Sequence, residues 1–384
     1  MLSLKTTLKP SPFDFAHLDA ILSRDMTGWL NLPDDADGVI PLIKKFVKER
    51  RGTWDKVLCL GMGGSALGIT ALKQAFFPFD DRLTVIGNLD SNTIHQLLKV
   101  LDPERTLILV ISKSGTTLET MTAFVIFKEK FSKKQYQKNF IAITDPEVGE
   151  LRKIAEQDGL TSFPIPPTVG GRFSVLSTVG LLPLALLGGT PEQLLAGAQA
   201  MKQRCFKKAQ NNPAFTLAQL AYVQKKPIVT FFSYSDQLYS LGLWYQQLLA
   251  ESIGKNRKVG LTPLPLRGAS DQHSVLQLLQ DGPNDKLNIF LNLLKPVHDV
   301  PVPNRKQSTH EILLLESRAT EQALREDDRP TITIEVSELS EQILGELFML
   351  FQMQIAILGE LYQVDAFNQP GVEKSKRIVK VAMK

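Results

Sequence analysis

The chain reads KVLCLGMGGSALG from residue 56 to residue 68, and this stretch predicts a buried strand followed by a tight turn and a helix. Residues 56–60 form an apolar run of strand length, and residues 66–77 have helical spacing. The glycines between them let the backbone turn tightly and come close to a ligand. Free amides at the start of the helix would then face an anion.

Two further stretches combine glycine with hydroxyl residues, SKSGTTLET at 112–120 and GGRFSVLS at 170–177. The first follows the strand-like run 106–111 and precedes a helical pattern at 121–131. A phosphate monoester dianion needs many hydrogen-bond donors, and small hydroxyl residues with helix amides can supply them. Such donors in the first two loops are Ser65, Ser112, Ser114, Thr116 and Thr117. Together, the three stretches predict a pocket for a sugar phosphate.

Nucleotide binding fits the same loops less well. The spacing of Gly61, Gly63 and Gly64 differs from the G-x-x-x-x-G-K-[ST] loop of nucleoside triphosphatases, and no Lys-Ser/Thr pair ends either loop. The dinucleotide fingerprint G-x-G-x-x-G/A is approached more closely, with Ala66 at its third position. A dinucleotide site therefore remains a weak alternative, as does an ordinary capped strand-to-helix turn.

The chain resembles the glucose-6-phosphate isomerase (phosphoglucose isomerase) family in six blocks, in the same order, from Gly61 to Lys376. The blocks are GMGGSALG (61–68), SKSGTTLET (112–120), GGRFSVLSTVGLLP (170–183), QLLAESIGK (247–255), SDQHSVLQLLQDGP (270–283) and NQPGVEKSK (368–376). Two pairs of residues depart from the family pattern: Ser114-Gly115 replaces a Thr-Phe pair found in many members, and Lys374-Ser375 replaces an apolar residue and a glycine.

An aldose-ketose isomerase needs a base for a carbon-bound proton, an acid-base group for the sugar ring and a cation facing the enediolate. The chain offers one candidate for each. Glu251 ends the apolar-rich helical run 238–250, where partial burial would suit a base. His273 lies in a polar, glycine-containing loop and titrates in the range that proton transfer needs. Arg172 follows two glycines that allow its permanent charge close to substrate oxygens.

The resemblance implies further roles. It assigns sugar contacts to Gln247 and Gln369, ring opening to His273 together with Lys376, and an orienting role beside His273 to Glu119, which is otherwise a carboxylate favoured in a first helical turn. It implies that the histidine block comes from a neighbouring subunit and that no metal or organic cofactor is needed. The phosphate ligands that it implies are Gly64, Ser65, Ser112, Lys113, Ser114 and Thr117.

Composition agrees with a compact enzyme: 384 residues, 43% of them hydrophobic, are enough for two domains with substantial cores. The net charge of +4 is small, and no basic tract with interleaved aromatics suggests nucleic acid. Two cysteines and no signal-peptide pattern predict a cytoplasmic protein without disulfides. The apolar stretch 343–361 contains glutamates and glutamines, which favours a buried amphipathic helix over a membrane span.

Strand-like and helical segments alternate along the chain, which predicts an α/β fold with two αβα sandwich (sugar-isomerase) domains and mainly parallel sheets. The expected divisions are an N-terminal extension at 1–34, a phosphate-binding domain at 35–200 and a second domain with a C-terminal helix and tail at 201–384, with the site between the domains. Strands are expected near residues 57, 83, 107 and 141, and at 228–232, 287–293, 312–315 and 332–336.

The expected activity is interconversion of glucose 6-phosphate and fructose 6-phosphate through a cis-enediolate, in glycolysis and gluconeogenesis, by a homodimer with a shared active site. Two alternatives remain open. One is a dual phosphoglucose/phosphomannose isomerase, for which Gly115 would provide extra room, although Gln247 resembles the glucose-specific arrangement. The other is a non-catalytic sugar-phosphate sensor, which would have no need of Glu251, His273 and Lys376 together.

Overall fold

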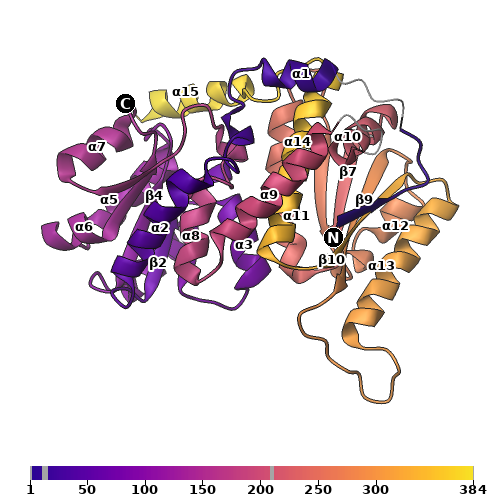
Figure 1. Ribbon diagram of the computed structural model, residues 1–384, viewed down its shortest axis with the longest axis horizontal. Helices are drawn as coiled ribbons and strands as arrows, with labels where there is room; N and C mark the ends of the chain where they lie inside the picture. Colours follow the sequence, from indigo (N-terminus) through magenta and orange to yellow (C-terminus); the bar gives the residue numbers. More distant parts are fainter. Residues whose placement is uncertain (1, 11–15, 208–211, 384) are drawn as a thin grey trace. The chain divides into compact units, whose positions relative to one another are not determined.

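The chain forms two compact units in the computed structural model, which describes residues 2–10, 16–207 and 212–383. The N-terminal unit comprises Gly28–Gly197, and the C-terminal unit comprises Ala198–Lys384 together with Met1–Thr27. Within the described residues, each unit contains one five-stranded sheet (Figure 1). Residues 1 and 11–15 of the expected N-terminal extension lie outside the described residues.

The N-terminal unit has a wholly parallel sheet with the strand order β3-β2-β4-β5-β6. Val57 on the interior strand β2 is paired with Leu83 on one side and Leu107 on the other. The four strands expected here near residues 57, 83, 107 and 141 are therefore confirmed. The strands are β2 (Lys56–Leu60), β3 (Leu83–Ile86), β4 (Thr106–Ile111), β5 (Phe140–Thr144) and β6 (Thr161–Pro164).

Helices cover both faces of this sheet (Figure 1). Leu58 and Leu60 pack into one buried cluster with residues of α4 to α7. Side chains alternate along a strand, so Val57 and Cys59 point to the opposite face, on the side of α2, α3 and α8. The helices are η1 (Gly28–Leu30), α2 (Ala36–Arg50), η2 (Gly63–Ser65), α3 (Leu67–Phe76), α4 (Ser91–Val100), α5 (Leu118–Lys128), α6 (Lys133–Asn139), α7 (Glu150–Asp158), η3 (Gly171–Phe173) and α8 (Thr178–Leu187), followed by α9 (Pro191–Phe206), which contains the unit boundary.

The C-terminal unit has the strand order β1-β10-β9-β7-β8, in which β1 is antiparallel to β10 and the other pairs are parallel. The parallel-dominated α/β fold is therefore confirmed in both units. The strands are β1 (Leu2–Lys5), β7 (Ile228–Ser233), β8 (Thr262–Arg267), β9 (Lys286–Lys295) and β10 (Thr331–Glu338). The helices are α1 (Ala16–Leu22), α10 (Pro213–Val223), α11 (Asp236–Ile253), η4 (Ser270–His273), α12 (Leu276–Gln280), α13 (Thr309–Glu326), α14 (Glu341–Leu361), η5 (Pro370–Val372) and α15 (Glu373–Ala382).

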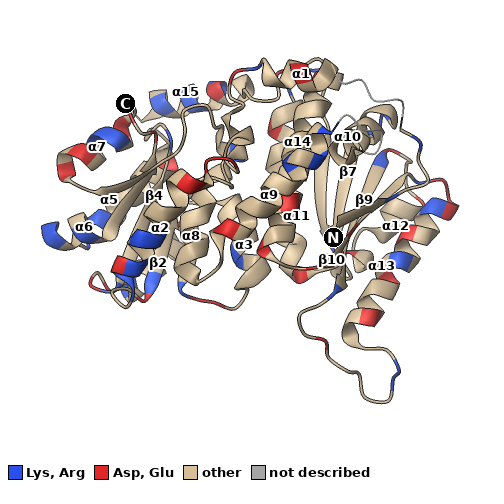
Figure 2. Cartoon of the chain, in the orientation of Figure 1, with Lys and Arg blue, Asp and Glu red and all other residues tan. Residues whose placement is uncertain are grey.

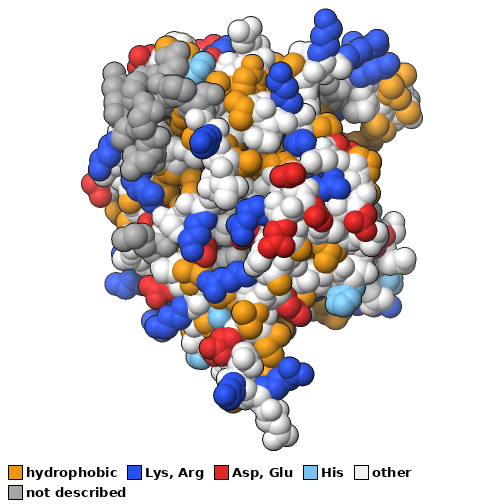
Figure 3. Space-filling model, turned by 90° about the vertical axis from the view of Figure 1, so that its right-hand side faces the viewer, with side chains coloured by type: hydrophobic (Ala, Val, Ile, Leu, Met, Phe, Trp, Pro, Cys, Tyr) orange, Lys and Arg blue, Asp and Glu red, His pale blue; other side chains and the backbone are white. Residues whose placement is uncertain are grey.

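Helix α14 is the core helix of this unit. It packs between α10 and α11, and α11 lies against β7 and β8 (Figure 1). Among the described helices, α14 alone is long and apolar enough to cross a membrane, but 94% of its apolar window is buried inside the protein, as expected from the sequence. On the other face, α12 and α13 present charged side chains interspersed with small apolar patches to solvent (Figure 3).

The prediction of a strand at residues 312–315 is wrong, because this apolar segment lies inside helix α13. A capping box starts the helix: Ser308 Oγ accepts a bond from the Glu311 amide at 3.2 Å, and the Ser308 amide donates to Glu311 Oε2 at 2.9 Å. These two bonds satisfy amides that a helix start leaves unpaired. The local cap therefore decides the structure of a run whose hydrophobicity alone fits a strand.

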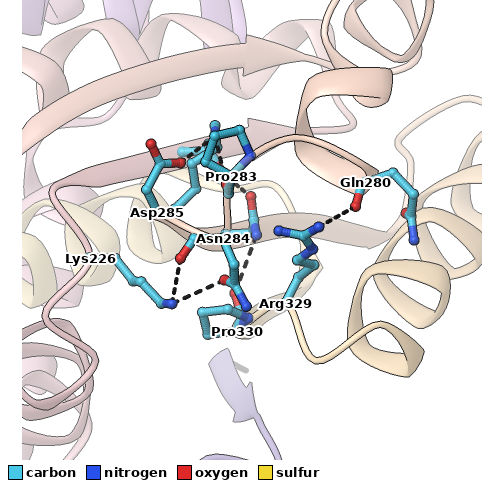
Figure 4. Close-up of polar contacts among 10 residues, drawn as sticks. Lys226, Gln280, Pro283, Asn284, Asp285, Arg329 and Pro330 are labelled. Atoms are coloured by element: carbon cyan, nitrogen blue, oxygen red, sulfur yellow. Dashed lines mark hydrogen bonds and ion pairs between the residues drawn. The ribbon is translucent and has the colours of Figure 1, made fainter.

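The amino ends of β7, β9 and β10 are joined by side chains that bond to loop carbonyls (Figure 4). Lys226 Nζ donates to the carbonyl of Asn284 at 2.6 Å, and Asn284 Nδ2 donates to the carbonyl of Asp328 at 3.1 Å. Nearby, Arg329 Nη2 donates to the carbonyl of Gln280 at 2.7 Å. This edge of the sheet is thus closed by structural contacts.

We expect Phe351→Ala in α14 to lower the free energy of unfolding of the C-terminal unit by about 3–5 kcal/mol, because it leaves a cavity in a close-packed core. Phe351 is fully buried, with its ring centroid 4.9 Å from that of Tyr245 and 5.5 Å from that of Phe231. Native-state hydrogen exchange of the α14 amides measures the loss. Leu315→Ala, at a side chain that is 53% exposed, is the control and should change stability by less than about 0.5 kcal/mol. Equal effects of the two substitutions would contradict this assignment of the core.

Candidate active site

The first and third glycine loops touch through their backbones in the N-terminal unit. An added Cβ at Gly64 would lie 2.1 Å from the carbonyl oxygen of Gly171 and 2.6 Å from the amide nitrogen of Arg172. Since real Cβ atoms do not approach other atoms so closely, only glycine allows η2 and η3 to pack in this way. The predicted phosphate ligands Gly64 and Ser65 therefore lie beside the predicted cation Arg172.

Arg172 is buried, with 3% of its surface exposed. Its guanidinium carbon lies 5.5 Å from the ring centroid of Phe173, and that ring stacks on Trp29 with centroids 5.1 Å apart. The aromatic pair anchors η3 and limits the positions that the arginine can take. A buried permanent cation beside a glycine turn is suited to stabilising negative charge on a ligand.

The second loop, residues 112–117, is organised by its own hydroxyl groups. Ser112 Oγ accepts a bond from the Gly115 amide at 3.1 Å and lies 3.2 Å from Thr117 Oγ1. Ser114 Oγ accepts from the Thr116 amide at 3.2 Å and lies 2.8 Å from Thr116 Oγ1. The loop ends at Thr117, the N-cap of α5, where the first helical amides are available to an anion.

Gly115 supports a backbone shape that other residues adopt poorly. Its φ is +67°, and an added Cβ would lie 2.0 Å from the amide nitrogen of Leu151. The loop therefore rests directly on the start of α7, and this contact is a physical reason for glycine at a position where many family members differ.

Lys113 joins the second loop to the third. Its Nζ donates to the carbonyls of Pro167 at 2.8 Å and Val169 at 3.2 Å, in the segment that leads to Arg172. Partial burial lowers the pKa of the Lys113 amine. Since β2 and β4 are parallel neighbours, their following loops lie at one edge of the sheet. The structure thus gathers Gly64, Ser65, Arg172 and the 112–117 loop at the carboxyl ends of these strands.

Glu251 lies in the last turn of α11, in the C-terminal unit. Its Oε1 accepts a hydrogen bond from Gln247 Nε2 at 3.1 Å, one helical turn earlier. The other amide atom, Gln247 Oε1, is buried and has no hydrogen-bond partner among the described residues. An amide oxygen of this kind is available to a donor from a ligand, such as a hydroxyl group.

Lys255 connects this helix end to the C-terminal segment. Its Nζ donates to the carbonyl of Glu251 at 2.7 Å and to the carbonyl of Asn368. The next residue, Gln369, helps to line a cavity of about 620 Å³ between residues 23–26 and 365–373. Gln247, Glu251 and Gln369 therefore belong to one region of the C-terminal unit.

Lys376 lies on the exposed helix α15, seven residues beyond Gln369. Its Nζ forms an ion pair with Glu373 Oε1 at 2.8 Å. Figure 2 shows the basic residues that α15 carries. The residue lies in an ordered helix rather than in an irregular tail.

His273 lies at the opposite end of the same sheet from Glu251. It ends η4, six residues after β8, and its side chain is exposed. Arg267 at the end of β8 forms two bonds with Asp236, the first residue of α11, at 2.7 and 2.6 Å. Glu251 is fifteen positions further along α11, or about 22 Å at the helical rise per residue. One copy of the C-terminal unit therefore does not bring Glu251 and His273 together.

Two residues with organising contacts were not singled out from the sequence. Lys255 lies two residues beyond the end of α11, where a lysine commonly bonds to the last helical carbonyls, and this position was a usable signal. Asp271 accepts from the Arg267 amide at 2.7 Å and from Ser274 Oγ at 2.8 Å, so it shapes the turn that carries His273. No sequence pattern points to these bonds. Within the described residues, no group of three His, Cys, Asp or Glu side chains is placed to hold a metal ion.

Comparison with known sequences finds relatives that match most of the chain. The family model described as phosphoglucose isomerase matches residues 44–327 and 320–384. A glucose-6-phosphate isomerase of Carboxydothermus hydrogenoformans is 37% identical over 386 aligned residues, which cover 91% of this chain and 83% of that protein. One from Thermus thermophilus is 35% identical, covering 91% and 88% respectively.

Comparison with solved structures also finds similarity over most of the chain. A hypothetical protein from Thermus thermophilus superposes with a TM-score of 0.91 at 33% identity, covering 96% of this chain and 94% of that one. A glucose-6-phosphate isomerase from Chlamydia trachomatis has a TM-score of 0.81 at 23% identity, covering 89% and 72% respectively, and so supports the fold.

We expect Gly64→Ala to disturb the packing of η2 on η3, because the new methyl group would overlap the Gly171 backbone. A stability loss of about 1–3 kcal/mol, with weaker binding of inorganic phosphate, is the expected result. Thermal unfolding and calorimetric phosphate titration are the measurements. Gly171→Ala is the matched control, since its added Cβ meets nothing within 4 Å. A Gly64→Ala protein that is as stable and binds phosphate as well as this control would show that the contact is unimportant.

Proposed function

The chain belongs to the phosphoglucose isomerase family, and on that premise we propose that it is an enzyme that interconverts glucose 6-phosphate and fructose 6-phosphate, as part of glycolysis and gluconeogenesis. The observation that carries the proposal is the carboxylate of Glu251, held by Gln247 beside a buried amide oxygen that lacks a partner among the described residues. A fixed carboxylate next to an available sugar-binding group is what proton transfer between two sugar carbons requires.

In this proposal the N-terminal unit binds the phosphate group. The hydroxyls of Ser65, Ser112, Ser114 and Thr117, the amide of Gly64 and the first amides of α5 are the donors. Lys113 adds positive charge beside them while its own bonds fix the loop. Hydroxyl and backbone amide donors have little conformational freedom, so many of them together can hold a dianion in one orientation.

Glu251 would remove the proton from carbon 2 of the open-chain aldose, forming a cis-enediolate, and return it to carbon 1 to give the ketose. Arg172 would stabilise the negative charge that develops on oxygen during this step. Gln247 and Gln369 would bind sugar hydroxyls and so keep the reacting carbons in reach of the carboxylate. The carbon-bound proton returns to the substrate, and the hydroxyl proton of O2 passes to O1 within the enediolate, so no proton is gained or lost overall.

His273 and Lys376 would open the sugar ring by transferring a proton between the ring oxygen and the C1 hydroxyl. The separation of about 22 Å along α11 keeps His273 of one C-terminal unit away from its own Glu251. We therefore assign the protein to a homodimer in which each site takes His273 from the second copy. A reducing cytoplasm fits the two cysteines, since Cys59 and Cys205 are both buried and unpaired with each other.

Replacement of the proposed base, Glu251→Gln, should lower kcat for fructose 6-phosphate by about 10²–10⁴-fold, because an amide cannot accept the carbon-bound proton. The measurement is conversion to glucose 6-phosphate, with calorimetric titration of a non-reacting sugar-phosphate analogue to show that binding persists. Mannose 6-phosphate is tested as a second substrate of the unmodified protein.

Glu326→Gln is a matched control, because Glu326 accepts the same kind of bond from the glutamine one turn earlier, at 2.7 Å, on an exposed helix. It should retain full activity. If the wild-type protein binds the analogue but converts no sugar phosphate, the protein is a sensor; if it converts mannose 6-phosphate equally well, it is a dual-specificity isomerase.

Mixing experiments test the shared site. Glu251→Gln and His273→Ala proteins should each be nearly inactive, but subunit exchange should restore about one quarter of wild-type activity. Half of the randomly mixed dimers are hybrids, and each hybrid contains one site with both residues intact. Isomerase activity is measured before and after the two variants are mixed. Mixtures that stay inactive although hybrids form would show that each chain completes its own site.

A further inference from the structure

A large cavity of the N-terminal unit lies away from the phosphate loops. It has a volume of about 1030 Å³ and is bordered by α2, the start of β2, the loop before β3 and the segment between α8 and α9. The glycine loops follow the other ends of the same strands. Strand β2 separates the two places by its length of five residues, or about 16 Å. The cavity is therefore distinct from the proposed catalytic site.

The inner part of the cavity is apolar. Ile43 and Leu186 contribute fully or almost fully buried side chains to its lining, with Val47 beside them. Trp54 adds a partly buried indole to the same lining. An aromatic side chain with one accessible surface in a partly apolar cavity can stack on a flat ring.

The rim carries basic and acidic side chains, and Figure 2 shows both kinds on α2 and in the loops beside β2. Most of them neutralise one another. Lys56 pairs with Asp81 at 2.7 Å, and Lys44 pairs with Glu192. The remaining rim carboxylate, Asp55, pairs with Arg105 at 2.7 Å.

Two rim cations are not neutralised in this way. The side chains of Lys48 and Arg51, at the end of α2, form no ion pair or hydrogen bond with any described residue. All three carboxylates of the rim are already paired with other cations. The cavity thus has surplus positive charge next to its aromatic and apolar wall.

We propose that this cavity is a second ligand site, for an anion that carries a flat aromatic ring, of the class of nucleoside monophosphates. Lys48 and Arg51 bind the phosphate, with the planar guanidinium offering two parallel donors, and Trp54 stacks on the base. The volume matches that of pockets which enclose a ligand of this size. The site is independent of the isomerase activity, because none of its residues is assigned to that reaction.

Intrinsic fluorescence provides a local test with adenosine 5′-monophosphate as the probe. Of the three tryptophans, Trp29 and Trp244 are 0% and 1% exposed, so Trp54 is the one that a ligand in this cavity can quench. We expect saturable quenching by the nucleotide that persists in saturating fructose 6-phosphate. Trp54→Phe should abolish the signal while calorimetry still detects binding.

The charge requirement is tested with a double substitution, Lys48→Gln with Arg51→Gln, which should weaken binding at least about tenfold through loss of charge-assisted bonds. Lys45→Gln, on the same helix but outside the cavity lining, is the control and should bind normally. Adenosine and inorganic phosphate should each bind much more weakly than the nucleotide. No quenching and no heat with the nucleotide would overturn the proposal, as would equal binding of adenosine or unchanged affinity in the double variant.

Discussion

The backbone contact between Gly64 and Gly171 is the constraint on which the arrangement of the N-terminal unit depends. It brings a turn that follows the interior strand β2 against the turn that carries Arg172, although more than a hundred residues separate them in the sequence. A side chain at Gly64 would separate the two turns and move a buried cation away from the phosphate loops. The parallel sheet places the 112–117 loop near these two turns, because the loops that follow parallel strands lie at the same edge of the sheet.

In the C-terminal unit the length of α11 has a comparable effect. The helix starts beside the carboxyl end of β8, where the turn of His273 also lies, and ends at Glu251 near the C-terminal segment. A rigid rod of this length cannot bring its two ends to one small substrate. The proposed site uses both residues, so this geometry supports the proposal that a second chain completes it.

Much of the fold could be predicted from the sequence because β2 and β4 are buried on both faces and read as uninterrupted apolar runs. Among the edge strands, β3 was predicted from the sequence, but β1, β6 and β8 were not. Strand β8 contains Pro263 and Pro265, which are tolerated because one side of an edge strand needs no amide donors. At 312–315 the cap at Ser308 outweighed local hydrophobicity. The candidate site residues were predicted from their motifs, but the separation of Glu251 and His273 is set by tertiary structure, which the local sequence does not show.

Two lysines show why residue type and motif alone do not determine a role. Lys113 donates to two carbonyls of the 167–169 segment, and Lys255 donates to the carbonyls of Glu251 and Asn368. An ammonium group has three donors and no acceptor, so these two bonds leave each lysine with one proton for any other partner. Both side chains therefore act first as links between separate segments. In the proposed site, hydroxyls and helix amides are then the principal phosphate donors, which is a reason for the many serines and threonines of the glycine loops.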